Sequence, residues 1–337
     1  MISTFNKVKS SKIVPLGLIF IAGIALGFFW SRATMNHVVK AIREGQEGYD
    51  FINPLLLTEN DKNIPSSEYT PIKNILTDYI DSAKTGKDID DISVYFRNLN
   101  DGQWVSVNPD ETYSPASMLK VVTLISAMRV AETDPDFLDK PVKVSGNVDF
   151  LTESQTVYPT ENPIKTGGTY TVKTLLDHLI IDSDNVANSV LSTLIGESRI
   201  HKTYEDLQLP QPESIKQGYT AEEYSHLFRA LYNATYVSHS LSENLLELLS
   251  RTKFTKGLVA GVPEDVVVSH KFGIKAVRSE AVAPLHRELH DCGIIYFPHN
   301  PYFLCVMTRG EDFSILEKVI QDISKLTWNK LVEIRRI

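Results

Sequence analysis

Residues 117–120 read Ser117-Met118-Leu119-Lys120, an SxxK element that opens a helix predicted over 117–132. Residues three apart share one face of a helix, so the Lys120 ammonium can reach the Ser117 hydroxyl. A serine at a helix N-terminus also lies at the positive end of the helix dipole, which favours an alkoxide. Taken alone the element is a weak signal, because Ser250-Arg251-Thr252-Lys253 repeats the pattern at a predicted helix end, where no dipole helps a nucleophile.

A second polar element, Ser183-Asp184-Asn185, separates two apolar helices predicted over 172–181 and 186–195. Ser, Asp and Asn are all common helix N-caps, so capping by itself explains the triplet. At this point a cap and a functional role both remain open.

The third element, His270-Lys271-Phe272-Gly273, ends a β-branched strand that begins near Val266. A lysine beside a glycine at a sheet edge can hold an anion close to the main chain. A similar string, Lys165-Thr166-Gly167, lies ahead of Ser183 in a glycine-rich segment, and we expect it to form a surface turn.

The remaining pattern places strands at both ends of the domain and helices between them. Residues 92–98 and 104–107 are predicted strands joined at Asn100-Asp101-Gly102, a strong hairpin signal, and 292–297 with 302–308 form a second hairpin. Amphipathic helices are predicted over 72–84, 221–233, 241–249 and 313–332. This order predicts one antiparallel sheet assembled from both ends, a helical lobe, and a binding cleft where the two meet.

SxxK, SDN and Lys-x-Gly in this order resemble the penicillin-recognising serine enzymes, which include class A β-lactamases and D,D-peptidases. The resemblance covers about residues 72–334, and the class A β-lactamase-like branch is the most similar. It implies an α/β (α+β) fold: a five-stranded antiparallel sheet flanked by terminal helices, plus an all-helical lobe.

The resemblance also implies roles for individual residues. Ser117 would be the acylated nucleophile, Lys120 its base or orienting group, and Ser183 the relay that carries a proton to the leaving nitrogen. Lys271 would set the electrostatic field around Ser183 and attract a substrate carboxylate. The substrate-binding residues implied are Asn185, Phe272, Gly273 and Ile274, and the amides of Ser117 and Ile274 would form an oxyanion hole, typically worth about 3–4 kcal/mol per donor.

Two departures from the family pattern affect the expected chemistry. Phe272 replaces the usual Thr or Ser whose hydroxyl helps bind the substrate carboxylate, a loss of about 1.5–3 kcal/mol that Arg278 is a candidate to offset. Residues 196–220 lack the glutamate motif that activates the deacylating water in class A β-lactamases. Glu205 and Glu213 are the nearest carboxylates, and without that glutamate we expect an acyl-enzyme that hydrolyses slowly.

The expected activity is amide cleavage in a β-lactam or a cell-wall peptide through an acyl-enzyme on Ser117. One alternative is a D,D-carboxypeptidase or transpeptidase acting on peptidoglycan, and a second is a catalytically weak protein that binds cell-wall peptide. No cofactor is expected, and no metal either, because His286 and His290 lack a third ligand at suitable spacing. A net charge of −8 and a pI near 5.6 argue against nucleic acid as a partner.

The N-terminal segment is predicted to be a membrane anchor. Residues 13–30 carry no charge and would span about 27 Å as a helix, close to the bilayer core of roughly 30 Å. The expected organisation is a cytoplasmic tail over 1–12, a single signal-anchor span over 13–30, a stalk or linker over 31–70 and the catalytic domain over 71–335. The domain would lie outside the cytoplasm, at a bacterial cell membrane.

The chain has two cysteines, Cys292 and Cys305, on the two arms of the second predicted hairpin. Pairing around residue 300 would put them diagonally across the hairpin, an awkward geometry for a disulfide. We therefore expect two buried thiols.

Overall fold

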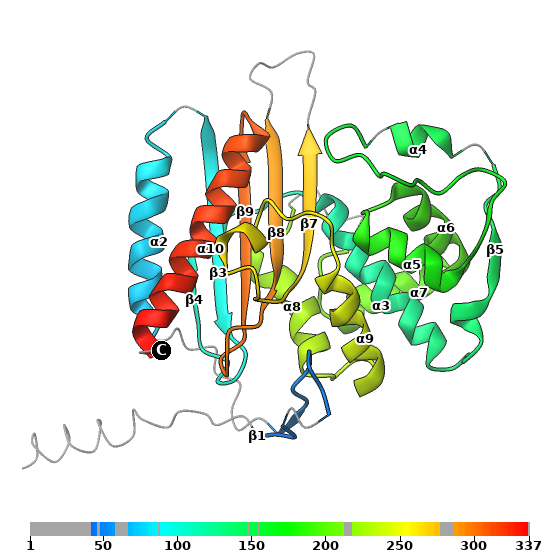
Figure 1. Ribbon diagram of the computed structural model, residues 1–337, viewed down its shortest axis with the longest axis horizontal. Helices are drawn as coiled ribbons and strands as arrows, with labels where there is room; N and C mark the ends of the chain where they lie inside the picture. Colours follow the sequence, from blue (N-terminus) through cyan, green and yellow to red (C-terminus); the bar gives the residue numbers. More distant parts are fainter. Residues whose placement is uncertain are drawn as a thin grey trace, which may run out of the picture. The chain divides into compact units, whose positions relative to one another are not determined.

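A computed structural model describes residues 42–45, 48–57, 67–86, 88–146, 148–153, 155–211, 218–276 and 286–335. Its centre is a five-stranded antiparallel sheet in the order β4-β3-β9-β8-β7. The strands are β3 (Ile89–Asn98), β4 (Trp104–Val107), β7 (Val268–Ala276), β8 (Arg287–Ile295) and β9 (Tyr302–Gly310). Because β3 from the start of the domain pairs with β9 from its end, the sheet is built from both ends, which confirms the expected topology (Figure 1).

Two helices from opposite ends of the domain cover one face of this sheet: α2 (Thr70–Ala83) and α10 (Phe313–Arg335) (Figure 1). In α2, Ile72, Leu76 and Ile80 recur every four residues and are all buried. They pack into one apolar cluster with alternate residues of the strands, such as Leu304 and Val306 of β9. Burying each such side chain contributes about 1.5–3 kcal/mol to the stability of this layer.

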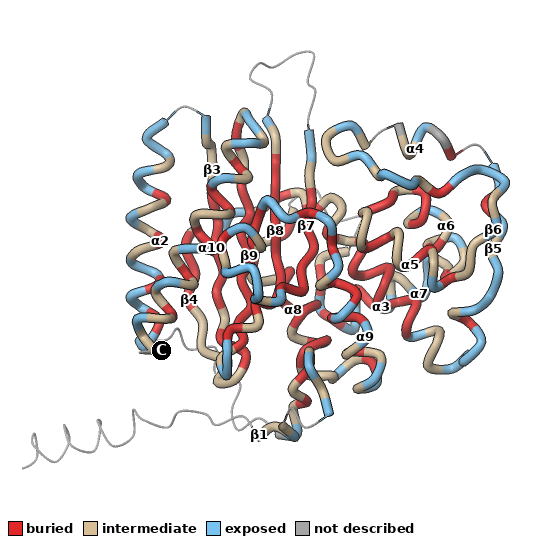
Figure 2. Tube along the Cα trace, viewed as in Figure 1, coloured by how far each residue is buried: buried red, intermediate tan, exposed pale blue. Residues whose placement is uncertain are grey.

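The other face of the sheet meets the helical lobe, where Figure 2 shows buried chain running through the centre of the helices. Its helices are α3 (Lys120–Ala131), α5 (Val172–Ile181), α6 (Asn185–Ile195), α7 (Glu197–Asp206), α8 (Ala221–Tyr232) and α9 (His239–Ser250). At its rim lie a short helix, α4 (Asp149–Glu153), and a two-stranded sheet of β5 (Pro141–Lys143) and β6 (Thr169–Thr171). The two-lobed arrangement agrees with the sequence prediction.

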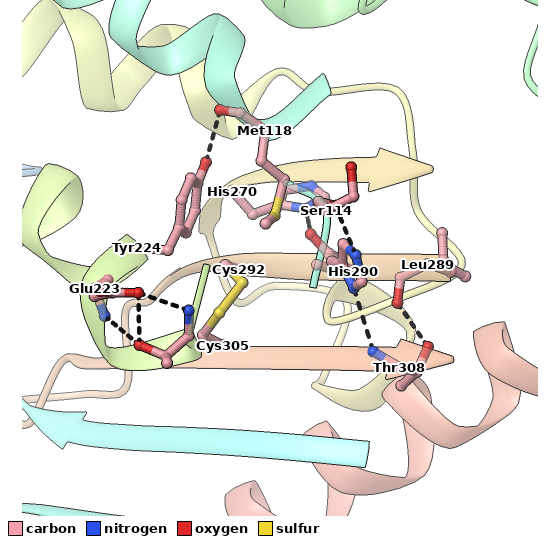
Figure 3. The surroundings of a disulfide bond; sticks show 12 residues. Ser114, Met118, Glu223, Tyr224, His270, Leu289, His290, Cys292, Cys305 and Thr308 are labelled. Atoms are coloured by element: carbon pink, nitrogen blue, oxygen red, sulfur yellow. Dashed lines mark hydrogen bonds and ion pairs between the residues drawn. A yellow bond between two sulfur atoms is a disulfide. The ribbon is translucent and has the colours of Figure 1, made fainter. Parts of the chain in front are cut away.

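The prediction of two free thiols is wrong, because Cys292 and Cys305 form a disulfide between β8 and β9 (Figure 3). Ile295 pairs with Tyr302, so the turn is centred between Pro298 and His299 rather than on residue 300. That shift places the two cysteines directly opposite each other in the register. Both are fully buried on the face that meets the helical lobe.

The predicted linker is wrong for residues 42–45 and 48–57, which pack against the helical lobe. Here β1 (Ile42–Arg43) pairs with β2 (Leu55–Leu57). Ile52 is fully buried, and the amides of residues 50–52 donate hydrogen bonds to the Glu243 carboxylate of α9. This contact joins positions about 190 residues apart, a distance over which local sequence pattern carries no information.

The proposed membrane span at 13–30 and the tail before it lie outside the described residues. No helix within the described ranges is long and apolar enough to cross a bilayer.

Candidate active site

Ser117 lies where the sheet and the helical lobe meet, in a short 3-10 turn (Ala116–Leu119) that leads directly into α3. Ala116, the residue before it, has a φ of 47°, a left-handed conformation that costs energy for a residue other than glycine. The turn packs closely on β7: a methyl group at Gly273 would lie 2.6 Å from the Pro115 carbonyl oxygen. Glycine at this position therefore lets the edge strand approach the serine.

Lys120 lies one turn after Ser117 and faces four oxygen atoms. Its Nζ is 3.1 Å from Ser117 Oγ, 3.2 Å from Ser183 Oγ and 2.7 Å from Asn185 Oδ1, and it also bonds the Ser183 carbonyl. Burial lowers the pKa of Lys120 to about 7, although the Asp184 carboxylate acts in the opposite direction. A neutral amine can donate to the carbonyl and amide oxygens and keep its lone pair for the Ser117 hydroxyl.

Ser183 lies in the break between α5 and α6, with a φ of 55° that turns its hydroxyl toward Lys120. The capping role considered for this triplet belongs to its middle residue, because Asp184 Oδ1 accepts the Ala187 amide at 2.8 Å. The second oxygen of Asp184 accepts the Ile164 amide at 3.3 Å. Asp184 thus fixes the break, and its neighbours supply the polar groups of the site.

Lys271 extends from β7 to the same serine. Its Nζ lies 2.8 Å from Ser183 Oγ and 3.1 Å from the Phe272 carbonyl oxygen, and the side chain is fully buried. Burial, with the nearby Lys120 charge, lowers the pKa of Lys271 well below its usual value. A continuous chain of contacts therefore runs from Ser117 through Lys120 and Ser183 to Lys271.

A family model described as "Beta-lactamase enzyme family" matches residues 71–331. The chain belongs to the β-lactamase enzyme family. It is also 24% identical over 266 residues to Beta-lactamase VEB-1 of Pseudomonas aeruginosa, which covers 71% of this chain and 84% of that protein. The family and the class A relatives identify it as a class A β-lactamase-like serine hydrolase.

Solved structures agree on the fold. A class A β-lactamase from Bacteroides cellulosilyticus has a TM-score of 0.64 at 18% identity and covers 78% of this chain and 99% of its own. A mutant PBP-A, solved as an acyl-enzyme complex with penicillin G, has a TM-score of 0.64 at 16% identity, with 80% and 99% covered. TLA-1 extended-spectrum β-lactamase has a TM-score of 0.63 at 18% identity, with 79% and 100% covered.

Within this β-lactamase-like site, Gln155 is a residue that sequence reasoning missed. It follows α4, donates to the Ser183 carbonyl at 3.2 Å and accepts the Asn185 amide at 2.9 Å. Both contacts hold the turn that carries Ser183. A lone glutamine in a polar segment gives no sequence signal for such a role.

Phe272 points into an aromatic cluster rather than toward solvent. Its ring stacks on Phe254 with 4.4 Å between centroids and meets Tyr158 edge-on at 5.4 Å. The hydroxyl expected from the family is therefore replaced by a buried apolar wall.

The two candidate deacylation carboxylates are not part of the described site. Glu205 is exposed on α7 and makes no hydrogen bond or ion pair with Ser117 or Lys120, while Glu213 lies outside the described residues. Arg278, considered as a replacement for the lost hydroxyl, also lies outside them.

The expectation that Lys165-Thr166-Gly167 forms a surface turn is confirmed. Residues 165–167 form an exposed turn, and Ser250 ends α9, away from any helix N-terminus. His286 bonds Asp90 and His290 bonds the Ser114 carbonyl oxygen, and the described residues contain no cluster suited to a metal ion.

Proposed function

We propose that the chain cleaves an amide bond through an acyl-enzyme on Ser117. The observation that carries this proposal is the position of Lys120 Nζ, 3.1 Å from Ser117 Oγ, with a pKa near 7. A large fraction of this amine is neutral at physiological pH and can accept the serine proton. Ser117 Oγ then attacks the carbonyl carbon, while the backbone amides of Ser117 and Ile274 stabilise the developing oxyanion.

Breakdown of the tetrahedral intermediate requires a proton on the leaving nitrogen. Ser183 Oγ is hydrogen-bonded to both lysines, so it can give its proton to that nitrogen and regain one from Lys120 as the carbon–nitrogen bond breaks. Lys271 polarises Ser183, and Asn185 and Gly273 line the substrate path. The acyl group remains on Ser117 as an ester.

The route of deacylation separates the candidate substrates. Class A β-lactamases use a glutamate to activate water, and no carboxylate in the described part of the chain bonds Ser117 or Lys120. The sequence between α7 and α8 is also short, because Asp206 and Ala221 are only 15 positions apart. These observations favour a long-lived acyl-enzyme, as in a D,D-carboxypeptidase or transpeptidase of cell-wall peptide, over rapid β-lactam hydrolysis.

We further propose that the domain works outside the cytoplasm, held by a single span over residues 13–30. The uncharged sequence of that segment supports an anchor, and the buried disulfide between Cys292 and Cys305 supports an oxidising compartment. Cell-wall peptide is available in that compartment of a bacterium.

The test is intact-mass spectrometry of the full chain in detergent, incubated with benzylpenicillin. We expect a stable mass gain that disappears in Ser117→Ala. An adduct that turns over within seconds would instead support an efficient β-lactamase. The absence of any adduct in the wild-type protein, with benzylpenicillin and with its methyl ester alike, would favour the binding-protein alternative.

A further inference from the structure

A cavity of about 260 Å³ is lined by residues of both lobes, with Phe272 of β7 from the sheet and Ile181 of α5 from the helical lobe. Ile181 and Asp182 directly precede Ser183, and Phe272 directly follows Lys271. The Phe272 ring that lines the cavity lies 4.2 Å from Lys271 Nζ, and Lys271 contacts Ser183, so the cavity borders the lysine that would steer the leaving group.

Three aromatic rings form the apolar wall of this cavity. Phe254 stacks on Phe272 at 4.4 Å with 22° between ring planes, and Tyr158 meets their edges at 5.1 and 5.4 Å. Phe254 and Phe272 are both about 95% buried. Packing of this kind gives a fixed surface for apolar groups.

Tyr158 is held in place from the far side of the cavity. Its hydroxyl donates a 2.6 Å hydrogen bond to Glu317 on α10, and the same carboxylate pairs with Lys256 at 3.4 Å. The ring therefore spans from the loop after α4 to the terminal helix, which limits its freedom to move aside.

Among the residues that the structure describes, the three lysines around this wall already have partners. Lys253 pairs with Glu161 and Asp182, each at 2.9 Å, and Lys256 pairs with Glu317. Lys271 is buried, donates to Ser183 and lies 4.2 Å from the centroid of the Phe272 ring. A substrate carboxylate placed here would have to displace one of these partners and would face a phenyl ring where the family has a hydroxyl.

We infer that this cavity is the leaving-group subsite and that it takes an uncharged, apolar group. The preferred substrates of Ser117 then lack a carboxylate beside the scissile amide, as does an amide bond within a longer chain. This inference rests on the proposed acyl-enzyme function. It narrows the substrate class to amides within a longer chain and disfavours D,D-carboxypeptidase substrates, whose leaving residue carries a carboxylate.

The experiment compares benzylpenicillin with its methyl ester, which carries the same acyl group without the negative charge. Acylation of the full chain in detergent is followed by intact mass, and each rate constant is normalised to the ring-opening rate of that compound in buffer. We expect the ester to react at least as fast as the acid. Phe272→Thr restores a hydroxyl and should shift the ratio toward the acid by about tenfold or more, whereas Phe272→Leu should not.

A second variant outside β7 tests the same subsite in case the substitutions at Phe272 prevent folding. Phe254→Ser opens the wall from the segment after α9, and it should slow the ester more than the acid. An acid that outpaces its ester in the wild-type protein would overturn the subsite while leaving the acyl-enzyme intact. No Ser117-dependent adduct with either compound would overturn the proposed function itself.

Discussion

The Lys271 amine nitrogen and the Ser183 hydroxyl lie 2.8 Å apart, and both side chains are at least 97% buried. A hydrogen bond in such a place is coupled strongly to the groups around it. We predict that Lys271→Met and Ser183→Ala each slow acylation by benzylpenicillin by about a hundredfold, or roughly 2.7 kcal/mol. The acylation rate of the double variant should fall by much less than the product of the two single reductions, which corresponds to a coupling energy of about 1–3 kcal/mol. Additive losses would show that the two groups act independently.

The rate of acylation should rise with pH through the pKa of Lys120, which is about 7. Below that value Lys120 is protonated and cannot accept the Ser117 proton, whereas above it the amine is free to do so. Rate constants measured between pH 5.5 and 9 should therefore reach a plateau above pH 8. Lys120→Arg, which stays charged throughout, should lose about a thousandfold or more at every pH. A flat wild-type profile would remove Lys120 as the base.

The same lowered pKa predicts a pH dependence of stability. Burial depresses the pKa of Lys120 from 10.5 to about 7, so the unfolded chain binds the extra proton between these two values. Stability attributable to this residue therefore rises with pH across that window. The free energy of unfolding of the wild-type protein minus that of Lys120→Met should increase by about 2 kcal/mol from pH 7 to pH 9. Denaturant titrations at the two pH values measure this difference, and a decrease would contradict the assigned shift.

Gln155 should act as a positioning residue through the turn that it holds. Gln155→Ala removes one hydrogen bond to the Ser183 carbonyl and one from the Asn185 amide, so acylation should slow by about tenfold. Gln155→Glu keeps the acceptor for Asn185 but loses the donor to Ser183. Because one of the two hydrogen bonds is kept, it should slow acylation less than Gln155→Ala does. Equal acylation rates of Gln155→Ala and the wild-type protein would show that the Ser183 turn keeps its conformation without the Gln155 side chain.

The disulfide should contribute to stability rather than to chemistry. Replacing both Cys292 and Cys305 with alanine removes a cross-link between positions 13 residues apart and gives the unfolded chain more freedom. The free energy of unfolding should fall by about 2–4 kcal/mol. The acylation rate of the folded variant should change by less than threefold, because neither sulfur contacts Ser117 or Lys120. Thermal unfolding and intact-mass kinetics on the same sample measure the two effects. A variant as stable as the wild-type protein would contradict the structural role.

Periodic patterns in the sequence were enough to predict most of the fold. Hydrophobic spacing predicted the helices, and Asn100-Asp101-Gly102 predicted the first hairpin, because both signals depend on residues a few positions apart. The order of the three motifs was also enough to predict which side chains meet at Ser117. The contacts of Lys120 and Lys271 with Ser183 agree with that prediction.

The errors arise where geometry depends on distant or subtle contacts. His299, with a φ of 57°, sets a turn whose centre differs by little more than one residue from the expected one, and that offset decides whether Cys292 faces Cys305. The packing of Ile52 depends on Glu243, and the role of Gln155 depends on the Ser183 turn. None of these pairings leaves a periodic pattern.

The pairing of β3 with β9 sets an order of events for a newly made chain. Ile92 of β3 lies opposite Thr308 of β9, so more than 200 further residues must be synthesised after Ile92 before its partner exists. The helices between can form from local contacts during that delay, whereas the sheet closes last. Lys271 lies on β7, which is joined to β3 only through β8 and β9. The nascent protein therefore has no assembled site while it is being made, and a chain that loses its last strand and helix should be inert toward penicillin.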